Sequence, residues 1–281
     1  MREYRSVRAC ELTTMRCGGT IGTLYEPETH EELEKLVTGL KHYVLIGGGS
    51  NLIFPDGLIA TPVIRLGAAF SSVEPAPGGL TAGSAAPLAQ VLHFCLENAL
   101  AGLEFLSGIP GTVGGALCMN AGTAETGIME RLIEARYVDG RGVHTVSGEE
   151  IPYRYRAGGF DDGAVIVSGL LRARPGLPGE IASTMKAFLN RRKSQPAGFT
   201  CGSVFKNPPG QSAGYLIEQA GLKGFRVGGA TVSEVHANFI INEGGATSAD
   251  IRSLVSAIKE RVKDRFGIEL EEEVRILDER L

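Results

Sequence analysis

The sequence predicts an α+β fold with more than one domain. Residues 29–40 open with a threonine followed three positions later by a glutamate, a helix-capping box, and continue with apolar residues at helical spacing. The apolar segment 43–46 is typical of a strand and runs directly into three glycines. Near the end of the chain, residues 247–266 predict a capped amphipathic helix and residues 268–277 an alternating strand. A chain of 281 residues is long for a single compact core.

The composition is that of a globular protein with an unusual share of glycine. The net charge is −4, so we expect neither a nucleic-acid partner nor binding to a membrane. The five cysteines are odd in number and show no C-x-x-C spacing, which argues against a disulfide framework or a zinc site, and no metal is expected. The N-terminus also lacks an apolar stretch, and together these features predict a cytoplasmic protein. The 39 glycines, about twice the average share, cluster in loops.

The first glycine loop is a candidate phosphate-binding element, because glycines leave backbone N–H groups open to close approach by a ligand. The Rossmann fingerprint is excluded, since Leu52 stands where that pattern needs a third glycine or alanine and Pro55 breaks any helix there. A P-loop is excluded because no Gly-Lys-Ser/Thr sequence follows. On this loop alone, a cradle for a dinucleotide diphosphate and a plain turn are equally supported. The candidate ligand residues are Ile46, Gly47, Gly48, Gly49, Ser50, Asn51 and Leu52.

A second glycine-dense segment strengthens the cradle interpretation. Residues 105–124 carry no charge and are long enough to span a membrane, but Pro110, Asn120 and several glycines favour a buried loop system. A large flat ligand needs backbone packed on several sides, and two such loops are harder to explain as turns. The candidate ligand residues here are Gly108, Ile109, Pro110, Gly111, Thr112, Gly114, Gly115, Asn120, Ala121 and Gly122.

Three residue types could carry chemistry. Arg156 precedes a glycine pair and could bind a carboxylate, although a surface arginine is the commoner case. Ser203 lies in a glycine-flanked turn without the G-x-S-x-G pattern, so a hydrolase triad is poorly supported. Glu273 shares a strand face with other glutamates, which is typical of a solvated surface unless one carboxylate faces a cleft. The candidate phosphate-binding side chains are Lys206 and Asn207.

Several motifs stand in the order found in one family, from about residue 13 to about residue 275. The chain resembles the UDP-N-acetylenolpyruvoylglucosamine reductases (MurB), bacterial flavoenzymes that make UDP-N-acetylmuramate for peptidoglycan. Blocks 202–208 and 232–239 are specific to this family, whereas the glycine loops alone indicate the wider FAD-binding fold of vanillyl-alcohol oxidase and p-cresol methylhydroxylase. The matching motifs are residues 46–52, 108–115, 119–122, 155–156, 194–196, 202–208, 221–224, 232–239 and 273–275.

The resemblance implies a fold and two cofactors. The fold is α+β, with a two-part FAD-binding domain of the p-cresol methylhydroxylase type (residues 1–55 and 56–193) and a smaller α+β substrate-binding domain (residues 194–281). The Pro/Gly break after the basic residues 191–193 agrees with the second boundary. The cofactors are non-covalent FAD and NADPH as co-substrate, and the substrate is UDP-N-acetylglucosamine enolpyruvate.

The resemblance also implies residue roles. In the family pattern, Arg156 and Glu273 polarise the substrate carboxylate and stabilise the intermediate, while Ser203 protonates the neighbouring carbon. The substrate-binding positions are Tyr155, Lys206 and Asn207.

The sequence does not decide which arginine and which glutamate are the catalytic ones. Two alternative functions also stay open. Arg154 repeats the Tyr-Arg pair, and Arg156 is preferred because it lies nearer the glycine pair, whose first member Gly158 replaces a serine common in the family. Any of the glutamates 271–273 fits, and Glu273 is preferred because Val-Arg follows it. Segment 156–167 is short, as in the subgroup without the substrate-clamping tyrosine loop, so the side chain that holds the UDP group is open. An oxidase of the same fold and an inactive FAD-binding module are the alternatives.

Overall fold

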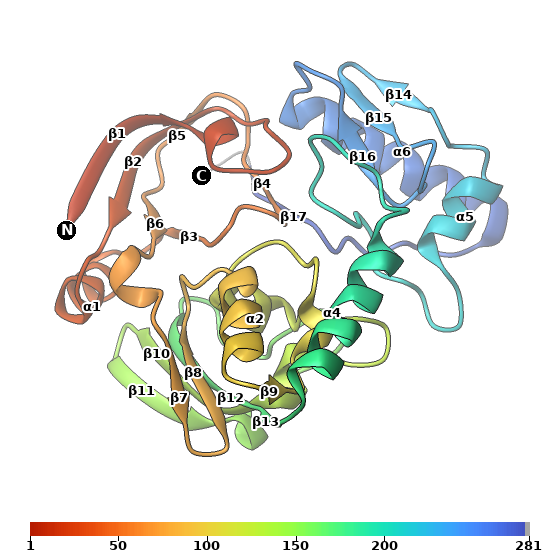
Figure 1. Ribbon diagram of the computed structural model, residues 1–281. Coiled ribbons are helices and arrows are strands. Elements are labelled where there is room, and N and C mark those ends of the chain that lie inside the picture. Colours follow the sequence, from red (N-terminus) through yellow and green to blue (C-terminus); the bar gives the residue numbers. More distant parts are fainter. Residues whose placement is uncertain (279–281) are drawn as a thin grey trace. The chain divides into compact units, whose positions relative to one another are not determined.

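The computed structural model describes residues 1–278, which divide into two compact units (Figure 1). The first unit contains Met1–Glu3, Leu24–Gly48 and Val63–Lys193, and the second contains Tyr4–Thr23, Gly49–Pro62 and the chain from Ser194 onward. The chain therefore passes from one unit to the other inside the first glycine loop, after Gly48. The three-part domain division expected from the sequence stays a prediction.

The first unit is built on a five-stranded antiparallel sheet with helices on both faces. Its strands are β7 (Val73–Ala76), β8 (Gly79–Gly83), β10 (Leu132–Asp139), β11 (Gly142–Ser147) and β12 (Val165–Arg172), in the order β11-β10-β12-β8-β7. Its helices are α1 (His30–Gly39), α2 (Leu88–Glu97), α3 (Val113–Met119) and α4 (Pro178–Arg192).

Alternation along β12 explains why both faces are covered. Val165 and Val167 pack in one apolar cluster with residues of α1, whereas Ile166 packs in a larger cluster with residues of α2 and α3. Helix α4 joins the larger cluster through Met185 and Phe188. Helix α1 therefore covers one face of the sheet and α2, α3 and α4 the other, as Figure 1 shows for α2 and α4.

The helix and the strand predicted before the first glycine loop are present, and a strand precedes them. Strand β2 (Thr20–Glu26) leads into α1 and then β3 (Val44–Ile46), and β6 (Val63–Arg65) pairs in parallel with both strands in this unit. Thr29 caps α1 by accepting a hydrogen bond of 3.2 Å from the N–H of Glu32, as the capping box predicts. The smaller elements are β9 (Leu100–Ala101), β13 (Arg174–Pro175), η2 (Ala68–Phe70), η3 (Glu104–Leu106), η4 (Ile128–Arg131) and η5 (Gly148–Glu150).

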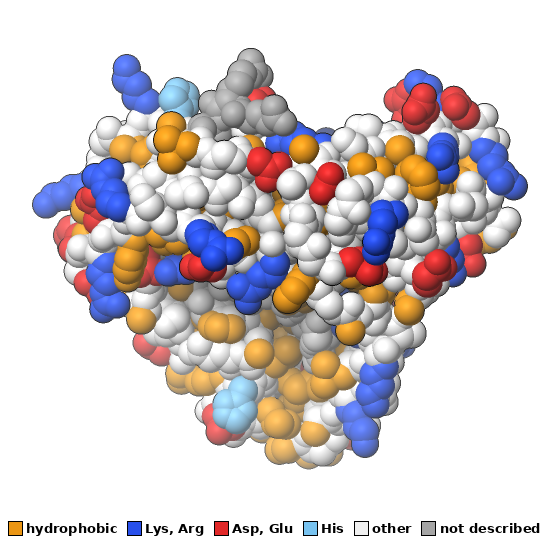
Figure 2. Space-filling view, turned by 90° about the horizontal axis from the view of Figure 1, so that it is seen from above, with side chains coloured by type: hydrophobic (Ala, Val, Ile, Leu, Met, Phe, Trp, Pro, Cys, Tyr) orange, Lys and Arg blue, Asp and Glu red, His pale blue; other side chains and the backbone are white. Residues whose placement is uncertain are grey.

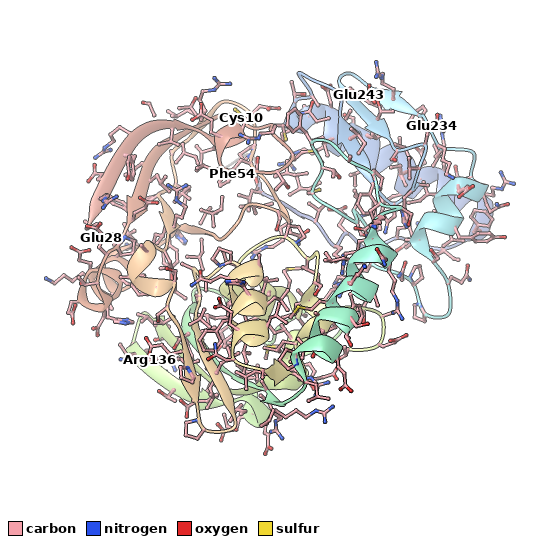
Figure 3. All side chains as sticks on the ribbon, in the orientation of Figure 1. Cys10, Glu28, Phe54, Arg136, Glu234 and Glu243 are labelled. Atoms are coloured by element: carbon pink, nitrogen blue, oxygen red, sulfur yellow. The ribbon has the colours of Figure 1, made fainter. Side chains whose placement is uncertain are left out.

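The second unit packs two helices on a small antiparallel sheet. Helices α5 (Ala213–Gln219) and α6 (Ser248–Phe266) share one core with β14 (Arg226–Val227), β15 (Ala230–Val232) and β16 (Ile240–Asn242). The remaining elements are β4 (Leu52–Ile53), β5 (Leu58–Ile59) and β17 (Arg275–Ile276), with β1 (Arg2–Arg8) and η1 (Ala9–Glu11) near the N-terminus. Phe54, labelled in Figure 3, is completely buried.

Two local predictions were wrong. Residues 268–277 form no continuous strand, because the segment changes partner: Glu273 donates its N–H to Val204, whereas the next residues, β17, pair in parallel with β4. Residues 105–124 are not only loops, since α3 forms within them and ends at Asn120, whose φ of +42° is left-handed. Gly114 lets α3 approach Ser84, because a Cβ atom on Gly114 would lie 2.8 Å from the Ser84 Cβ.

The helices and surface charges of the described residues bear on membrane spanning and nucleic-acid binding. Within residues 1–278, no helix combines the length and apolar character needed to cross a membrane. On the face drawn in Figure 2, Lys and Arg side chains are interspersed with Asp and Glu.

Asp56 links segment 49–62 to the start of α6 by hydrogen bonds, and replacing it should lower the stability of the second unit. The two Asp56 carboxylate oxygens accept hydrogen bonds of 3.0 Å each from the N–H groups of Ser248 and Ala249 in the first turn of α6. We expect Asp56→Ala to lower the free energy of unfolding by about 1–2 kcal/mol, because these N–H groups lose a charged acceptor at a helix N-terminus. Urea unfolding followed by circular dichroism measures the change. Asp264→Ala, near the other end of α6, is the matched control and should change stability by less than about 0.5 kcal/mol. Equal effects of the two substitutions would contradict the assignment.

Candidate active site

Arg156 occupies a tight turn in the first unit. Its φ of +56° is left-handed, and reciprocal backbone hydrogen bonds of 2.8 and 3.0 Å join Arg154 and Ala157 on either side of it. Such a φ is unfavourable for a residue with a side chain, so the surroundings must hold the turn. The Arg156 side chain is half-buried, whereas Arg154 is exposed. This difference favours Arg156 over Arg154 as the arginine that serves a site.

Asn120 holds this turn against the end of α3. Its side-chain N–H donates to the carbonyl of Arg154 at 3.0 Å, and its side-chain oxygen accepts from the N–H of Met129 at 3.1 Å. The bond to Met129 is buried and the bond to Arg154 is partly buried, so the first is shielded from water more than the second. Asn120 was predicted to bind the cofactor, and that role stays a prediction; the structure adds a role in fixing the arginine turn.

Gly158, where the family commonly has serine, also lies against α3. Its N–H donates to the carbonyl of Cys118 at 2.8 Å, and a Cβ atom would lie 1.9 Å from the carbonyl oxygen of Leu117. A serine cannot be placed here without moving the backbone. The departure from the family pattern is therefore explained by the packing of the arginine turn on α3.

The two glycine loops meet within the first unit. A Cβ atom on Gly48 would lie 2.8 Å from the Cα of Gly111, and one on Gly47 would lie 2.7 Å from the Oγ1 of Thr112. The end of β3 and the segment before α3 are thus in backbone contact. Next to the second loop, the buried hydroxyls of Ser84 and Ser107 have no hydrogen-bond partner among the described residues.

In the second unit, the rest of the first loop is tied to the segment that carries Glu273. Thr14 donates its N–H to the carbonyl of Gly49 at 3.0 Å. The Asn51 side-chain N–H donates to the carbonyl of Glu273 at 3.0 Å, and the Asn51 carbonyl accepts from the N–H of Arg275 at 3.1 Å. Three hydrogen bonds therefore fix residues 49–51. Sequence reasoning treated Asn51 only as a cofactor ligand and missed this link.

The surroundings of the three neighbouring glutamates differ. Glu271 forms an ion pair with Lys206, and Glu272 forms one of 2.9 Å with Lys259. The pKa of the Cys201 thiol is raised to about 12, mainly by burial, with smaller contributions from the nearby Cys17 and Glu273. The Glu273 carboxylate therefore lies close to the interior of this unit, which favours it as the functional glutamate.

Asn238 holds the extended segment that carries Ser203. Its side chain makes two hydrogen bonds to the backbone of Phe205, accepting from the N–H at 2.9 Å and donating to the carbonyl at 2.8 Å. Its own carbonyl accepts the N–H of Val204 at 2.8 Å, and Val204 in turn accepts the N–H of Glu273 at 2.8 Å. The segments of Ser203 and Glu273 are therefore neighbours. The family block 232–239 contains Asn238, but its supporting role needed the structure.

The three predicted substrate-binding residues have differing surroundings. Lys206 is paired with Glu271, as described, and the Asn207 side-chain oxygen accepts the N–H of Ala213 at 3.0 Å, at the start of α5. Tyr155 is exposed, with the Arg156 guanidinium carbon 4.9 Å from its ring centre. Contact of these residues with a substrate stays a prediction.

Comparison with known proteins decides the family. A model of the FAD binding domain matches residues 23–147, and one of the UDP-N-acetylenolpyruvoylglucosamine reductase C-terminal domain matches residues 195–277. The chain is 42% identical over 278 residues to the UDP-N-acetylenolpyruvoylglucosamine reductase of Syntrophobacter fumaroxidans, covering 94% of this chain and 81% of the relative. It is 43% identical over 272 residues to that of a Bradyrhizobium species, covering 94% and 88%. The chain belongs to the UDP-N-acetylenolpyruvoylglucosamine reductase family.

The solved structures agree with the family assignment. The reductase from Thermus caldophilus superimposes with a TM-score of 0.89 at 36% identity, covering 99% of this chain and 100% of the other. The predicted family and the predicted fold class, an FAD-binding domain followed by the reductase C-terminal domain, are both confirmed.

The residues present fit FAD, the cofactor of this reductase family. Two glycine loops that meet in the first unit supply open backbone, and the buried hydroxyls of Ser84 and Ser107 in the same unit have no partner among residues 1–278. Buried hydroxyls without hydrogen-bond partners are rare in protein interiors. Such hydroxyls can donate hydrogen bonds to the oxygen atoms of a bound dinucleotide. These hydroxyls and the glycine loops would hold FAD.

Replacing Asn51 should separate its donor role from its size. We expect Asn51→Ala and Asn51→Asp each to lower the free energy of unfolding by about 1 kcal/mol, because neither side chain can donate to the Glu273 carbonyl when aspartate is ionised. Urea unfolding at neutral pH measures the effect. An Asn51→Asp protein as stable as the wild type would show that the bond to Glu273 contributes nothing.

Proposed function

We propose that this chain catalyses the NADPH-dependent, FAD-mediated reduction of UDP-N-acetylglucosamine enolpyruvate to UDP-N-acetylmuramate, a step of peptidoglycan synthesis, in the cytoplasm. The observation that carries the proposal is the near full-length similarity to UDP-N-acetylenolpyruvoylglucosamine reductases. The retained arginine, serine and glutamate motifs support it. The proposal includes neither a nucleic-acid nor a membrane partner.

Arg156 supplies charge to the reaction. FAD, when bound, takes a hydride from NADPH and supplies it to the vinyl carbon of the substrate. Negative charge then develops beside the substrate carboxylate. The Arg156 guanidinium can donate two parallel hydrogen bonds to that carboxylate, and its half-buried position strengthens the interaction relative to water. The turn fixed by Asn120 holds the arginine in place before substrate arrives, so little reorganisation is needed.

Ser203 donates the proton of the reaction, and Glu273 stabilises the negative charge of the intermediate. The Ser203 hydroxyl donates a proton to the carbon next to the one that receives the hydride, which forms the second new C–H bond, and Asn238 holds the segment that carries Ser203. Glu273 can stabilise a developing enolate oxygen only by donating a hydrogen bond, because an ionised carboxylate accepts but does not donate. We therefore assign to Glu273 the protonated form during this step.

Substrate-dependent consumption of NADPH tests the proposed function. Purified protein should oxidise NADPH rapidly only when the enolpyruvyl nucleotide is present. An oxidase of the same fold would consume oxygen without that nucleotide, and an inactive FAD-binding module would consume no NADPH under either condition. Either outcome would overturn the proposal.

The role of Ser203 can be isolated by dividing the reaction into its two halves. We expect Ser203→Ala to leave reduction of the flavin by NADPH within about twofold of the wild-type rate, while oxidation of the reduced flavin by substrate falls by a factor on the order of 10² or more, because only the second half needs the proton. Anaerobic stopped-flow absorbance measures both rates. Equal losses of rate in the two half-reactions would contradict the assignment of Ser203 as the proton donor.

Replacing Arg154 and Arg156 one at a time tests which of the two is the catalytic arginine. We expect Arg156→Ala to lower kcat/KM by a factor on the order of 10² or more, and Arg154→Ala, at an exposed position in the same turn, by less than about fivefold. Steady-state kinetics with varied substrate decides between them. A larger loss in the Arg154 variant would move the site by two residues.

A further inference from the structure

A second arginine lies against the second glycine loop in the first unit. Arg192 stands in the last turn of α4, and a Cβ atom on Gly108 would lie 2.7 Å from its Cδ and 3.6 Å from its Nε. Gly108 has a φ of +77°, so a residue with a side chain would be both strained and obstructed there. The Arg192 side chain therefore rests directly on the turn that opens this loop.

Arg192 is also close to the charge of Arg156. Burial lowers the pKa of the Arg192 guanidinium, and the positive charge of Arg156 lowers it further. No acidic side chain within residues 1–278 forms an ion pair with Arg192. A half-buried guanidinium group such as that of Arg192, next to another positive charge, is stabilised when an anionic group binds to it.

We propose that Arg192 binds a phosphate group of a nucleotide ligand, beside the carboxylate assigned to Arg156. A phosphate suits this position because it offers several acceptor oxygens to the planar fork of an arginine. The proposal rests on the proposed function for the identity of the ligands. Three phosphate sources are available: the diphosphate of UDP in the substrate, the 2′-phosphate of NADPH, and the diphosphate of FAD.

The neighbouring Arg191 supplies a matched control. It follows Leu189 and Asn190 on the same helix and carries the same charge, but it is exposed and its guanidinium carbon lies 5.2 Å from the ring centre of Phe188. Arg191→Met and Arg192→Met therefore make the same chemical change one residue apart. Arg192→Lys keeps the positive charge and most of the packing on Gly108 but loses the planar fork.

Ligand binding to the FAD-loaded protein tests the proposal without turnover. Isothermal titration calorimetry with UDP and uridine tests the diphosphate of the substrate. The same measurement with 2′,5′-ADP and adenosine 5′-monophosphate tests the 2′-phosphate of NADPH. The flavin fluorescence released on dilution tests the diphosphate of FAD. We expect Arg192→Met to weaken binding of UDP, 2′,5′-ADP or FAD by about tenfold or more, with a smaller loss in Arg192→Lys. Uridine binding and all affinities of Arg191→Met should stay within about twofold of wild type. The probe that is lost identifies the phosphate.

Two outcomes would overturn the proposal. The first is an Arg192→Met protein that binds UDP, 2′,5′-ADP and FAD as the wild type does. The second is a loss of uridine binding as large as the loss of UDP binding, since that would indicate a change of shape instead of a lost phosphate contact. Thermal unfolding of each variant, with Arg192→Lys as the conservative change, verifies that the fold is retained. Wild-type protein that binds these nucleotides but does not turn over the enolpyruvyl substrate would refute the proposed function. The binding test of Arg192 would still be valid in that case.

Discussion

The hydrogen bond from the Asn51 side chain to the Glu273 carbonyl joins the second half of the cofactor loop to the candidate acidic residue. Glu273 in turn donates its N–H to Val204, the neighbour of Ser203. Residues separated by more than 200 positions in the chain thus form one hydrogen-bonded cluster in the second unit. Because backbone groups carry most of these bonds, the positions of Ser203 and Glu273 are fixed by the fold and not by the flexibility of their own side chains.

Asparagine plays the same supporting part in both units. Asn120, at the end of α3, donates to the carbonyl of Arg154 in the arginine turn and accepts from the N–H of Met129, and Asn238 uses both ends of its amide to hold the segment of Ser203. A side-chain amide can donate and accept at once, so it can bond to backbone where no strand partner is available. Both residues are buried, where an unmet hydrogen bond is most unfavourable. Each unit therefore presents its candidate catalytic residue from a preorganised backbone.

Sequence patterns predicted those features that depend on local chemistry. The helix cap at Thr29, the capped helix that begins after Thr247, and the family motifs were all visible in the sequence and are present. Features that depend on distant partners were missed. The segment before β17 alternates like a strand but changes partner from Val204 to β4. The ion pairs of Glu271 with Lys206 and of Glu272 with Lys259 join distant segments, and the position of Arg192 depends on the packing of α4 against Gly108. No local pattern contains that information.

The flavin spectrum of the wild-type protein under anaerobic conditions tests the central claim most directly, because it follows both cofactor and substrate in one sample. The account predicts a yellow protein whose flavin absorbance is bleached by NADPH and restored by the enolpyruvyl nucleotide. Protein that remains colourless after supplementation with FAD, or flavin that NADPH bleaches and the nucleotide does not restore, would contradict it.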